Sequence, residues 1–282
     1  MVRTQNTCKN CGNTFVGKYC NRCGEKVYSE HDKNIAHLAE EGLHFVTHFE
    51  GTFLVTLRTI LTRPGKLSVD YCNGIRKKYF KPLPFFLMLI VLYLIFPLFK
   101  GLNMELQNHI GNSFYGDYAS AKIDEWRSTN SWTMEETTVR FQAVSEKASK
   151  FLLFSIIPFM AVLNWPLLRN RRKFFFDHFI FTTETASFFL LWGFLLLPLL
   201  LLMVSKIAVL LGGSFSFGDE GVTAFLALVP FFFYVWIAFK RFYLLSNLSA
   251  LLYAGLYVIV FTSFVLIVYK FLLFVVSAYF IR

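Results

Sequence analysis

Charge is scarce in this sequence. Charged residues make up 16% of the 282 positions and hydrophobic residues 55%, with 35 phenylalanines among them. Soluble domains are about 25% charged and about 45–50% apolar, and one soluble core of this length could not bury so many large apolar side chains. The composition therefore excludes an ordinary water-soluble globular protein and indicates that a lipid bilayer surrounds much of the chain.

Acidic residues are the scarcer of the two charge types. The chain has 18 Asp and Glu against 28 Lys and Arg, which gives a formal net charge of +10. In an apolar chain, such an excess orients the membrane spans and contacts anionic lipid headgroups. We therefore expect a lipid bilayer with anionic headgroups as a partner, and we expect no nucleic acid.

A secretory signal peptide and a disulfide framework are also missing. Residues 1–33 are polar, with no apolar segment and no small-residue cleavage site. Four of the 5 cysteines fall in two Cys-x-x-Cys pairs near the start of the chain and Cys72 stands alone, a distribution that does not suit paired disulfides. We expect the amino terminus to remain in the reducing cytosol.

The clustered cysteines have the spacing of a small zinc ribbon, Cys8-x2-Cys11-x8-Cys20-x2-Cys23. Four thiolates satisfy tetrahedral zinc and leave no open position, which marks a structural site with one ion. Gly12 and Gly24 follow the second cysteine of each pair, where glycine lets the backbone turn sharply. A redox dithiol is the alternative, although it needs only one pair and usually a βαβ setting.

The next segment is amphipathic. Apolar residues recur at three- and four-residue steps, which predicts a helix over Asn34–Leu61 that ends at Arg63-Pro64-Gly65. Such a helix suits the membrane interface or the underside of a bundle. We therefore divide the chain into a zinc-ribbon-like head and linker (1–33), an amphipathic juxtamembrane helix and basic segment (34–82), and a helical transmembrane bundle (83–282) with an outer loop near 100–150.

Long apolar stretches fill the rest of the chain. A helix needs about 20 residues to cross a bilayer, and the stretches of this kind are Leu83–Phe99, Phe151–Leu168, Phe179–Val204, Val222–Phe239 and Leu248–Tyr269, with apolar sequence continuing to Ile281. The outer loop should hold a helix over Thr138–Lys150 that leads into the second span. We predict an all-α membrane protein, a bundle of about five transmembrane helices preceded by an amphipathic helix and a small cytosolic zinc ribbon.

Basic residues mark alternate ends of these spans. Lys240 and Arg241 follow the fourth span. The residues expected to contact lipid headgroups are Arg76, Lys77, Lys78 and Lys81 before the first span and Arg169, Arg171, Arg172 and Lys173 after the second. Because cytoplasmic loops carry the excess of Lys and Arg, this pattern places the head in the cytosol and the outer loop and the carboxyl terminus outside.

One carboxylate falls inside a span. Glu184 lies about 9 Å into the third span at 1.5 Å per residue, where an ionisable side chain is costly and is a functional candidate. Asn164, His178 and Asn247 should lie near the same membrane face, and with Glu184 they form a candidate intramembrane polar cluster. The alternatives are a polar clasp that holds helices together or a glutamate close enough to the surface to stay hydrated.

The stretch RPGKLSVDYCNGIRKKYFKPLPFF carries a pattern of Pro-Gly, Tyr, Gly-x-Arg, Tyr and Pro ahead of the first span. With the cysteine pairs and the later RNRRKFFFDHFIF, it resembles the uncharacterised bacterial membrane proteins catalogued as domain of unknown function 3667, over nearly the whole chain. The matching positions are Pro64, Gly65, Tyr71, Gly74, Arg76, Tyr79, Pro82 and His178. The resemblance implies a multi-pass protein with a zinc-ribbon-like head, which we expect in the bacterial cytoplasmic (inner) membrane. It implies no activity and no catalytic residues.

Signatures of catalysis are missing from the sequence, which has no phosphate-binding loop, no Gly-x-Ser-x-Gly elbow and no two-metal carboxylate set. We therefore expect a non-enzymatic scaffold or regulatory membrane protein, whose cytosolic zinc site binds a protein partner or supports the bundle. A small transporter or channel that uses the polar cluster around Glu184 is the alternative. A lipid-acting enzyme with His178 and Glu184 as acid and base is a third hypothesis.

Overall fold

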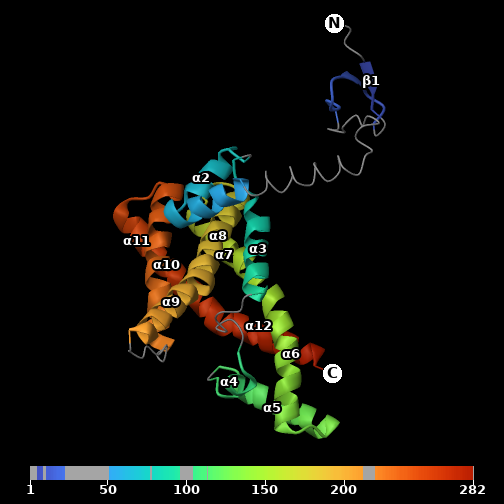
Figure 1. Ribbon diagram of the computed structural model, residues 1–282, viewed down its shortest axis with the longest axis vertical. Coiled ribbons are helices and arrows are strands. Elements are labelled where there is room, and N and C mark those ends of the chain that lie inside the picture. Colours follow the sequence, from blue (N-terminus) through green and yellow to red (C-terminus); the bar gives the residue numbers. More distant parts are fainter. Residues whose placement is uncertain are drawn as a thin grey trace. The chain divides into compact units, whose positions relative to one another are not determined.

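The computed structural model describes residues 5–8, 11–22, 51–76, 78–95, 104–112, 114–211 and 220–281 (Figure 1). The chain forms two compact units, Met1–Thr52 and Phe53–Arg282. Cys23, Lys77 and residues 34–50 of the predicted amphipathic helix lie outside the described residues.

The first unit contains a short antiparallel hairpin. Strand β1 (Gln5–Thr7) pairs with β2 (Thr14–Val16) so that Asn6 lies opposite Phe15. Phe15 points inward and packs with Cys8 and Cys20, whereas the residues on either side of it are exposed, the alternation expected of a strand. A two-stranded hairpin with so small a core needs a further stabilising element.

The second unit is built from helices. The helix Gly51–Thr62, which belongs to this unit from Phe53 onward, ends directly before Arg63-Pro64-Gly65, and this confirms the predicted helix stop. The elements that follow are α2 (Lys66–Cys72), α3 (Pro82–Ile95), α4 (Leu106–Ile110), α5 (Gly116–Asn130), α6 (Met134–Leu152), the 3₁₀ turn η2 (Leu153–Ser155), α7 (Ile156–Leu168), α8 (Phe175–Phe189), the π-helical η3 (Leu190–Leu196), α9 (Leu197–Leu210), α10 (Glu220–Tyr243), α11 (Asn247–Ser263), the π-helical η4 (Phe264–Tyr269) and α12 (Lys270–Phe280).

Within the described residues, 4 continuous helices are long and apolar enough to cross a membrane. They are Met134–Leu168, Phe175–Leu210, Gly221–Tyr243 and Asn247–Phe280. These helices contain the second to fifth predicted spans, and each extends beyond the predicted bounds. The all-α membrane bundle predicted from the sequence is therefore confirmed.

The first predicted span, Leu83–Phe99, differs from the others. It coincides with α3, whose 14 residues extend about 21 Å at 1.5 Å per residue. The hydrocarbon core of a bilayer is about 30 Å thick, so the described part of α3 is shorter than a full crossing. Apolar composition had set the predicted length, although the stretch contains Pro97, a residue type that ends or kinks a helix.

Helix α8 is the central helix of the bundle. Every residue from Ile180 to Phe188 is buried, and α2, α3, α7 and α10 all pack against it. Phe181 lies in an aromatic cluster, with its ring centroid 4.9–5.2 Å from those of Phe239, Phe242 and Tyr243. Polar side chains on this helix are therefore enclosed by protein and not by lipid.

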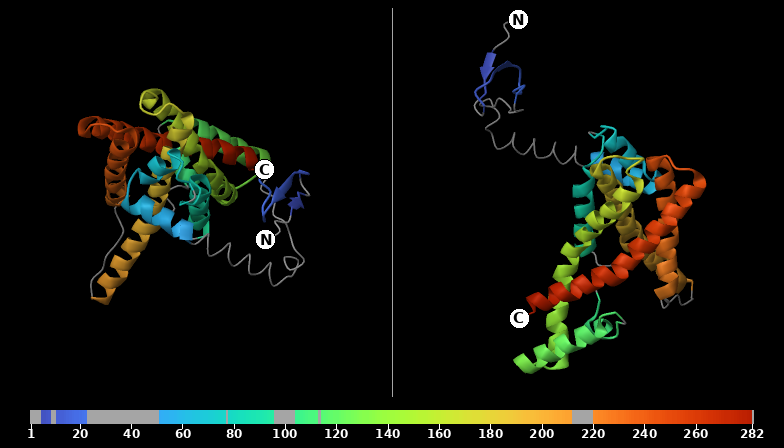
Figure 2. Two further views of the ribbon diagram at one scale, coloured as in Figure 1. Left: turned by 90° about the horizontal axis from the view of Figure 1, so that it is seen from above. Right: turned by 180° about the vertical axis from the view of Figure 1, so that it is seen from behind.

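Helices α4, α5 and the first part of α6 lie at the opposite end of the bundle from α2 (Figures 1 and 2). Thr133 starts α6 with a capping box, in which its hydroxyl oxygen accepts from the Glu136 N–H and the Glu136 carboxylate accepts from the Thr133 N–H. The predicted helix over Thr138–Lys150 is confirmed within this longer α6. These helices bury a small core together with Phe274 and Ile281 near the carboxyl terminus.

His109 belongs to that core. Its side chain is fully buried, and its Nδ1 lies 2.8 Å from the Tyr115 hydroxyl oxygen. Burial lowers the pKa of His109 to about 4, and the positive charge of Lys270 acts in the same direction. The imidazole is therefore neutral at neutral pH and packs as an aromatic side chain.

Candidate functional site

Three of the four predicted metal ligands lie together. The sulfur atoms of Cys8, Cys11 and Cys20 are all within 4.8 Å of one another, and those of Cys11 and Cys20 are 3.7 Å apart. Tetrahedral Zn–S bonds of about 2.3 Å separate neighbouring sulfur atoms by about 3.8 Å. These three cysteines could therefore hold a metal ion; Cys23, the predicted fourth ligand, is outside the described residues.

The backbone around Cys8 forms the tight turn that such a site requires. The Gly12 N–H donates to the Cys8 carbonyl oxygen at 2.9 Å, and Gly12 has a φ of +70°, which glycine adopts without strain. This is the conformation expected for the residue after the second cysteine of the pair. The Asn13 amide nitrogen lies 3.9 Å from the Cys20 sulfur atom, and such outer contacts stabilise thiolate ligands.

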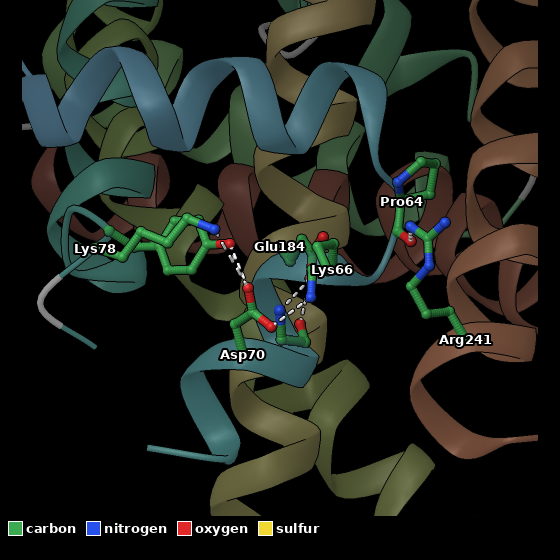
Figure 3. A network of polar contacts seen from close by, with 8 residues as sticks. Pro64, Lys66, Asp70, Lys78, Glu184 and Arg241 are labelled. Carbon is green, nitrogen blue, oxygen red and sulfur yellow. Dashed lines mark hydrogen bonds and ion pairs between the residues drawn. The ribbon is translucent and has the colours of Figure 1, made fainter. Parts of the chain in front are cut away.

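Glu184 is enclosed where α2, α8 and α10 meet (Figure 3). Its side chain is 1% exposed. Its Oε2 accepts hydrogen bonds from the Ser68 N–H at 2.8 Å and from the Ser68 hydroxyl, and its Oε1 accepts from the Tyr234 hydroxyl at 3.2 Å. Both carboxylate oxygens therefore have protein donors, and Glu184 connects α8 to two other helices.

Helix α2 reaches Glu184 because the turn before it lies directly on α10. Gly65 has a φ of +75°, and a Cβ at this position would lie 2.9 Å from the Cα and the carbonyl oxygen of Ala238. The Pro64 carbonyl oxygen accepts a hydrogen bond from the Arg241 guanidinium (Figure 3). Small residues permit this close approach of two backbones. We call residues 63–76 the clasp segment.

Replacing Gly65 by alanine should separate the clasp segment from α10. Two costs add in this variant: about 1–2 kcal/mol for a left-handed residue with a Cβ and about 1–3 kcal/mol for overpacking against Ala238. Gly74→Ala is the matched control, because Gly74 has a φ of +93° but nothing lies within 4 Å of a Cβ there. Thermal unfolding in detergent should therefore show a clearly larger loss for Gly65→Ala. Equal losses would mean that the contact with Ala238 contributes nothing.

Asp70 connects α2 to the chain that follows this helix. It is 4% exposed and accepts hydrogen bonds from Lys66 Nζ at 2.7 Å and from the Tyr79 hydroxyl at 2.6 Å, with Lys78 Nζ at 3.9 Å. Burial by itself would raise the pKa of Asp70, but the hydrogen bonds from Lys66 and Tyr79 and the charges of Lys66 and Lys78 outweigh it and hold the pKa below its usual value. The ionised carboxylate therefore ties the chain that leaves α2 back onto this helix (Figure 3).

His178 lies near the start of α8 and is fully buried. Its Nε2 lies 2.9 Å from the Arg172 carbonyl oxygen and its Nδ1 lies 2.9 Å from the Tyr243 hydroxyl oxygen. The Arg172 guanidinium covers the Phe242 ring, 4.6 Å from its centroid. His178 thus holds the loop between α7 and α8 against the end of α10.

The four members of the predicted polar cluster have separate surroundings. Asn164 is 5% exposed, and its Nδ2 has no hydrogen-bond partner among the described residues. Asn247 is exposed at the start of α11, where its carbonyl oxygen accepts from the Trp236 indole N–H at 3.3 Å. In the part of the chain that the structure describes, no hydrogen bond joins Asn164, His178, Glu184 or Asn247 to another member of the four.

The basic segments meet at one end of the bundle. The Arg76 guanidinium lies 5.4 Å from the centroid of the Phe176 ring, Arg172 covers Phe242, and Arg241 donates to the Pro64 carbonyl oxygen. These contacts connect the segments before α3, after α7 and at the end of α10. The remaining described residues expected to contact headgroups are exposed: Lys78, Lys81, Arg169, Arg171 and Lys173.

The sequence did not identify the partners of Glu184. Ser68 stands between Leu67 and Val69 in a short helix, and Tyr234 is one of 13 tyrosines. The only signal was the physical requirement that a buried carboxylate have donors, which does not say where those donors stand in the chain.

Residues 50–94 match the model of the family described as Protein of unknown function (DUF3667). The match confirms the resemblance for this segment. The segment contains Ser68, which bonds to Glu184, and Asp70, which bonds to Tyr79. No curated protein and no solved structure matches the chain.

Proposed function

We propose that this member of the DUF3667 family is a non-enzymatic scaffold or regulatory membrane protein, whose amino-terminal cysteines hold one structural zinc ion and bind a cytosolic protein partner. The observation that favours a scaffold over a transporter or an enzyme is the bonding of Glu184, and the proximity of Cys8, Cys11 and Cys20 supports the metal site. The Glu184 oxygens accept from Ser68 and Tyr234 in a position that is 1% exposed. A carboxylate held in this way fastens α2 to the bundle, and this weighs against a transporter or an enzyme that uses Glu184 on a passing substrate.

Zinc is the metal that best suits the cysteine unit. Its ligands would be the thiolates of Cys8, Cys11 and Cys20, whose separation fits tetrahedral Zn–S bonds, with Cys23 completing the set. Thiolates favour zinc over magnesium or calcium, which prefer oxygen ligands. Four protein ligands leave no place for a substrate, so the ion supports the fold of the hairpin and the surface that the hairpin presents.

We propose that the amino-terminal unit faces the bacterial cytosol and that the carboxyl terminus lies on the other side of the cytoplasmic membrane. The proposal is supported by the contacts of Arg76, Arg172 and Arg241, which bring three basic segments to one end of the bundle. The positive-inside rule makes that end cytoplasmic. With α3 as a short crossing and the 4 longer helices, the two termini fall on opposite sides.

The partner-binding role is tested by chemical cross-linking in intact membranes followed by purification of the chain. Wild type and Cys72→Ser should recover the same specific protein in near-stoichiometric amounts, because Cys72 lies outside the amino-terminal unit. Cys8→Ser should lose it while remaining inserted in the membrane at the wild-type level. Equal recovery with Cys8→Ser and wild type would contradict the proposed role of the head.

A further inference from the structure

A crevice opens between α7 and α11. It encloses about 90 Å³, and its lining residues are Met160, Leu163, Asn164 and Leu167 of α7, Phe239 of α10, and Tyr253, Leu256, Tyr257 and Val260 of α11. On both α7 and α11 these residues follow the i, i+3, i+4, i+7 spacing of a single helix face. Leu163, Leu167 and Leu256 are exposed, so the crevice opens sideways toward the surrounding lipid.

The crevice has one closed end. Beyond Met160 and Val260, the rings of Phe159 and Phe264 stack with their centroids 4.0 Å apart and join α7 to η4. From Phe159 to Leu168, the last residue of α7, the helix rises about 13 Å. The opposite end of the crevice, at Leu167, is therefore the end near the basic residues that follow α7.

Asn164 supplies a polar group inside this apolar crevice. Its side chain is 95% buried, since only 5% of it is exposed, and its Nδ2 has no partner among the described residues. Two tyrosines, Tyr253 and Tyr257, also line the crevice, and the Tyr257 hydroxyl oxygen already lies 2.7 Å from the Thr185 hydroxyl oxygen. A buried N–H without an acceptor is costly, and the acceptors that a bilayer offers are ester carbonyl and phosphate oxygens.

The mouth of the crevice is positively charged. Arg169, Arg171 and Lys173 follow α7 directly and are exposed. No described carboxylate forms an ion pair with them. Asn164 precedes Arg169 by about 7 Å along the helix, a separation close to that between the phosphate of a phospholipid and its glycerol esters.

We propose that the crevice binds one anionic phospholipid. A segment of an acyl chain lies in the crevice between α7 and α11, the Asn164 side chain turns so that its Nδ2 donates a hydrogen bond to an ester carbonyl oxygen, and the phosphate contacts Arg169 and Arg171. The site is built from the second unit alone, so it does not depend on zinc or on a protein partner of the head.

Native mass spectrometry of the full chain in detergent tests this site with phosphatidylglycerol and phosphatidylcholine of the same acyl length. Wild type should retain one phosphatidylglycerol in preference to phosphatidylcholine. Leu256→Trp fills the crevice and should reduce retention about tenfold, a change of 1.4 kcal/mol. Leu252→Trp is the matched control, because Leu252 is 66% exposed on the same helix and is not a lining residue.

Two further variants separate the contributions within the site. Asn164→Leu removes one hydrogen bond in a membrane setting and should weaken retention about three- to tenfold. Replacing Arg169 and Arg171 by glutamine should abolish the preference for phosphatidylglycerol. Equal retention of both lipids by wild type, or equal losses in Leu256→Trp and Leu252→Trp, would overturn the proposal. A further result would also overturn the proposal: a wild-type dimer that Leu256→Trp dissociates and Leu252→Trp does not. In that case a second copy of the chain, and not a lipid, would occupy the crevice.

Discussion

Replacing Glu184 by alanine is expected to lower the free energy of unfolding of the second unit by about 3–5 kcal/mol. The change leaves three donors without their acceptor: the Ser68 N–H, the Ser68 hydroxyl and the Tyr234 hydroxyl. It also removes the side chain from a fully packed position. Glu184→Gln keeps the volume and one acceptor oxygen, so its loss should be about half as large.

The Glu184 prediction is checked by equilibrium unfolding in mixed detergent micelles. Glu125→Ala is the matched control, because Glu125 is exposed and its carboxylate pairs with Lys122 on the same helix; its effect should stay within about 0.5 kcal/mol. Hydrogen exchange should rise first in the clasp segment of Glu184→Ala, before the rest of the bundle opens. A Glu184→Ala protein as stable as Glu125→Ala would show that the carboxylate fastens nothing.

Removal of the metal is expected to unfold the amino-terminal unit. Structural zinc contributes about 10–16 kcal/mol in small zinc-binding peptides, whereas the buried core of the hairpin, among the residues that the structure describes, consists of Cys8, Phe15 and Cys20. Purified wild type should contain one zinc per chain, and Cys8→Ser should contain almost none. Amide protection in residues 5–22 should disappear in Cys8→Ser and in chelated wild type.

Cys72→Ser is the control for the metal prediction. Burial raises the pKa of the Cys72 thiol, and the nearby negative charge of Asp177 raises it further, so this sulfur is unsuited to bind a metal as thiolate. Cys72→Ser should therefore keep a full complement of zinc. Zinc that stayed in Cys8→Ser, or left in Cys72→Ser, would contradict the assignment of the ligands.

The sequence predicted the features that depend on local spacing or on composition. Short spacing within and between the pairs brings Cys8, Cys11 and Cys20 together, and the Pro64-Gly65 pair ends a helix by its own backbone preferences. Five long apolar stretches were predicted to span the membrane, and four of them lie in described helices long enough to cross it, because burial in a bilayer depends on hydrophobicity summed over about 20 residues.

The polar cluster could not be predicted in the same way. The rise of 1.5 Å per residue gives the depth of Asn164, His178 and Glu184 in the membrane, but the direction that each side chain faces depends on how the helices pack. Glu184 faces α2 and α10, His178 faces the end of α10, and Asn164 faces the crevice. Ser68 lies 116 residues from Glu184 in the chain, a separation over which periodicity carries no information.

The central claim is that the DUF3667 segment is fastened to α8 through Glu184. A double-mutant cycle with Ser68→Ala and Glu184→Gln measures this connection directly, with unfolding followed in detergent. The cycle should give a coupling free energy of about 1–2 kcal/mol, because both changes act on the hydrogen bond that the Ser68 hydroxyl donates to Glu184 Oε2. If the effects of the two changes simply add, the two residues act independently. That result would contradict the claim that Glu184 holds the clasp segment against α8.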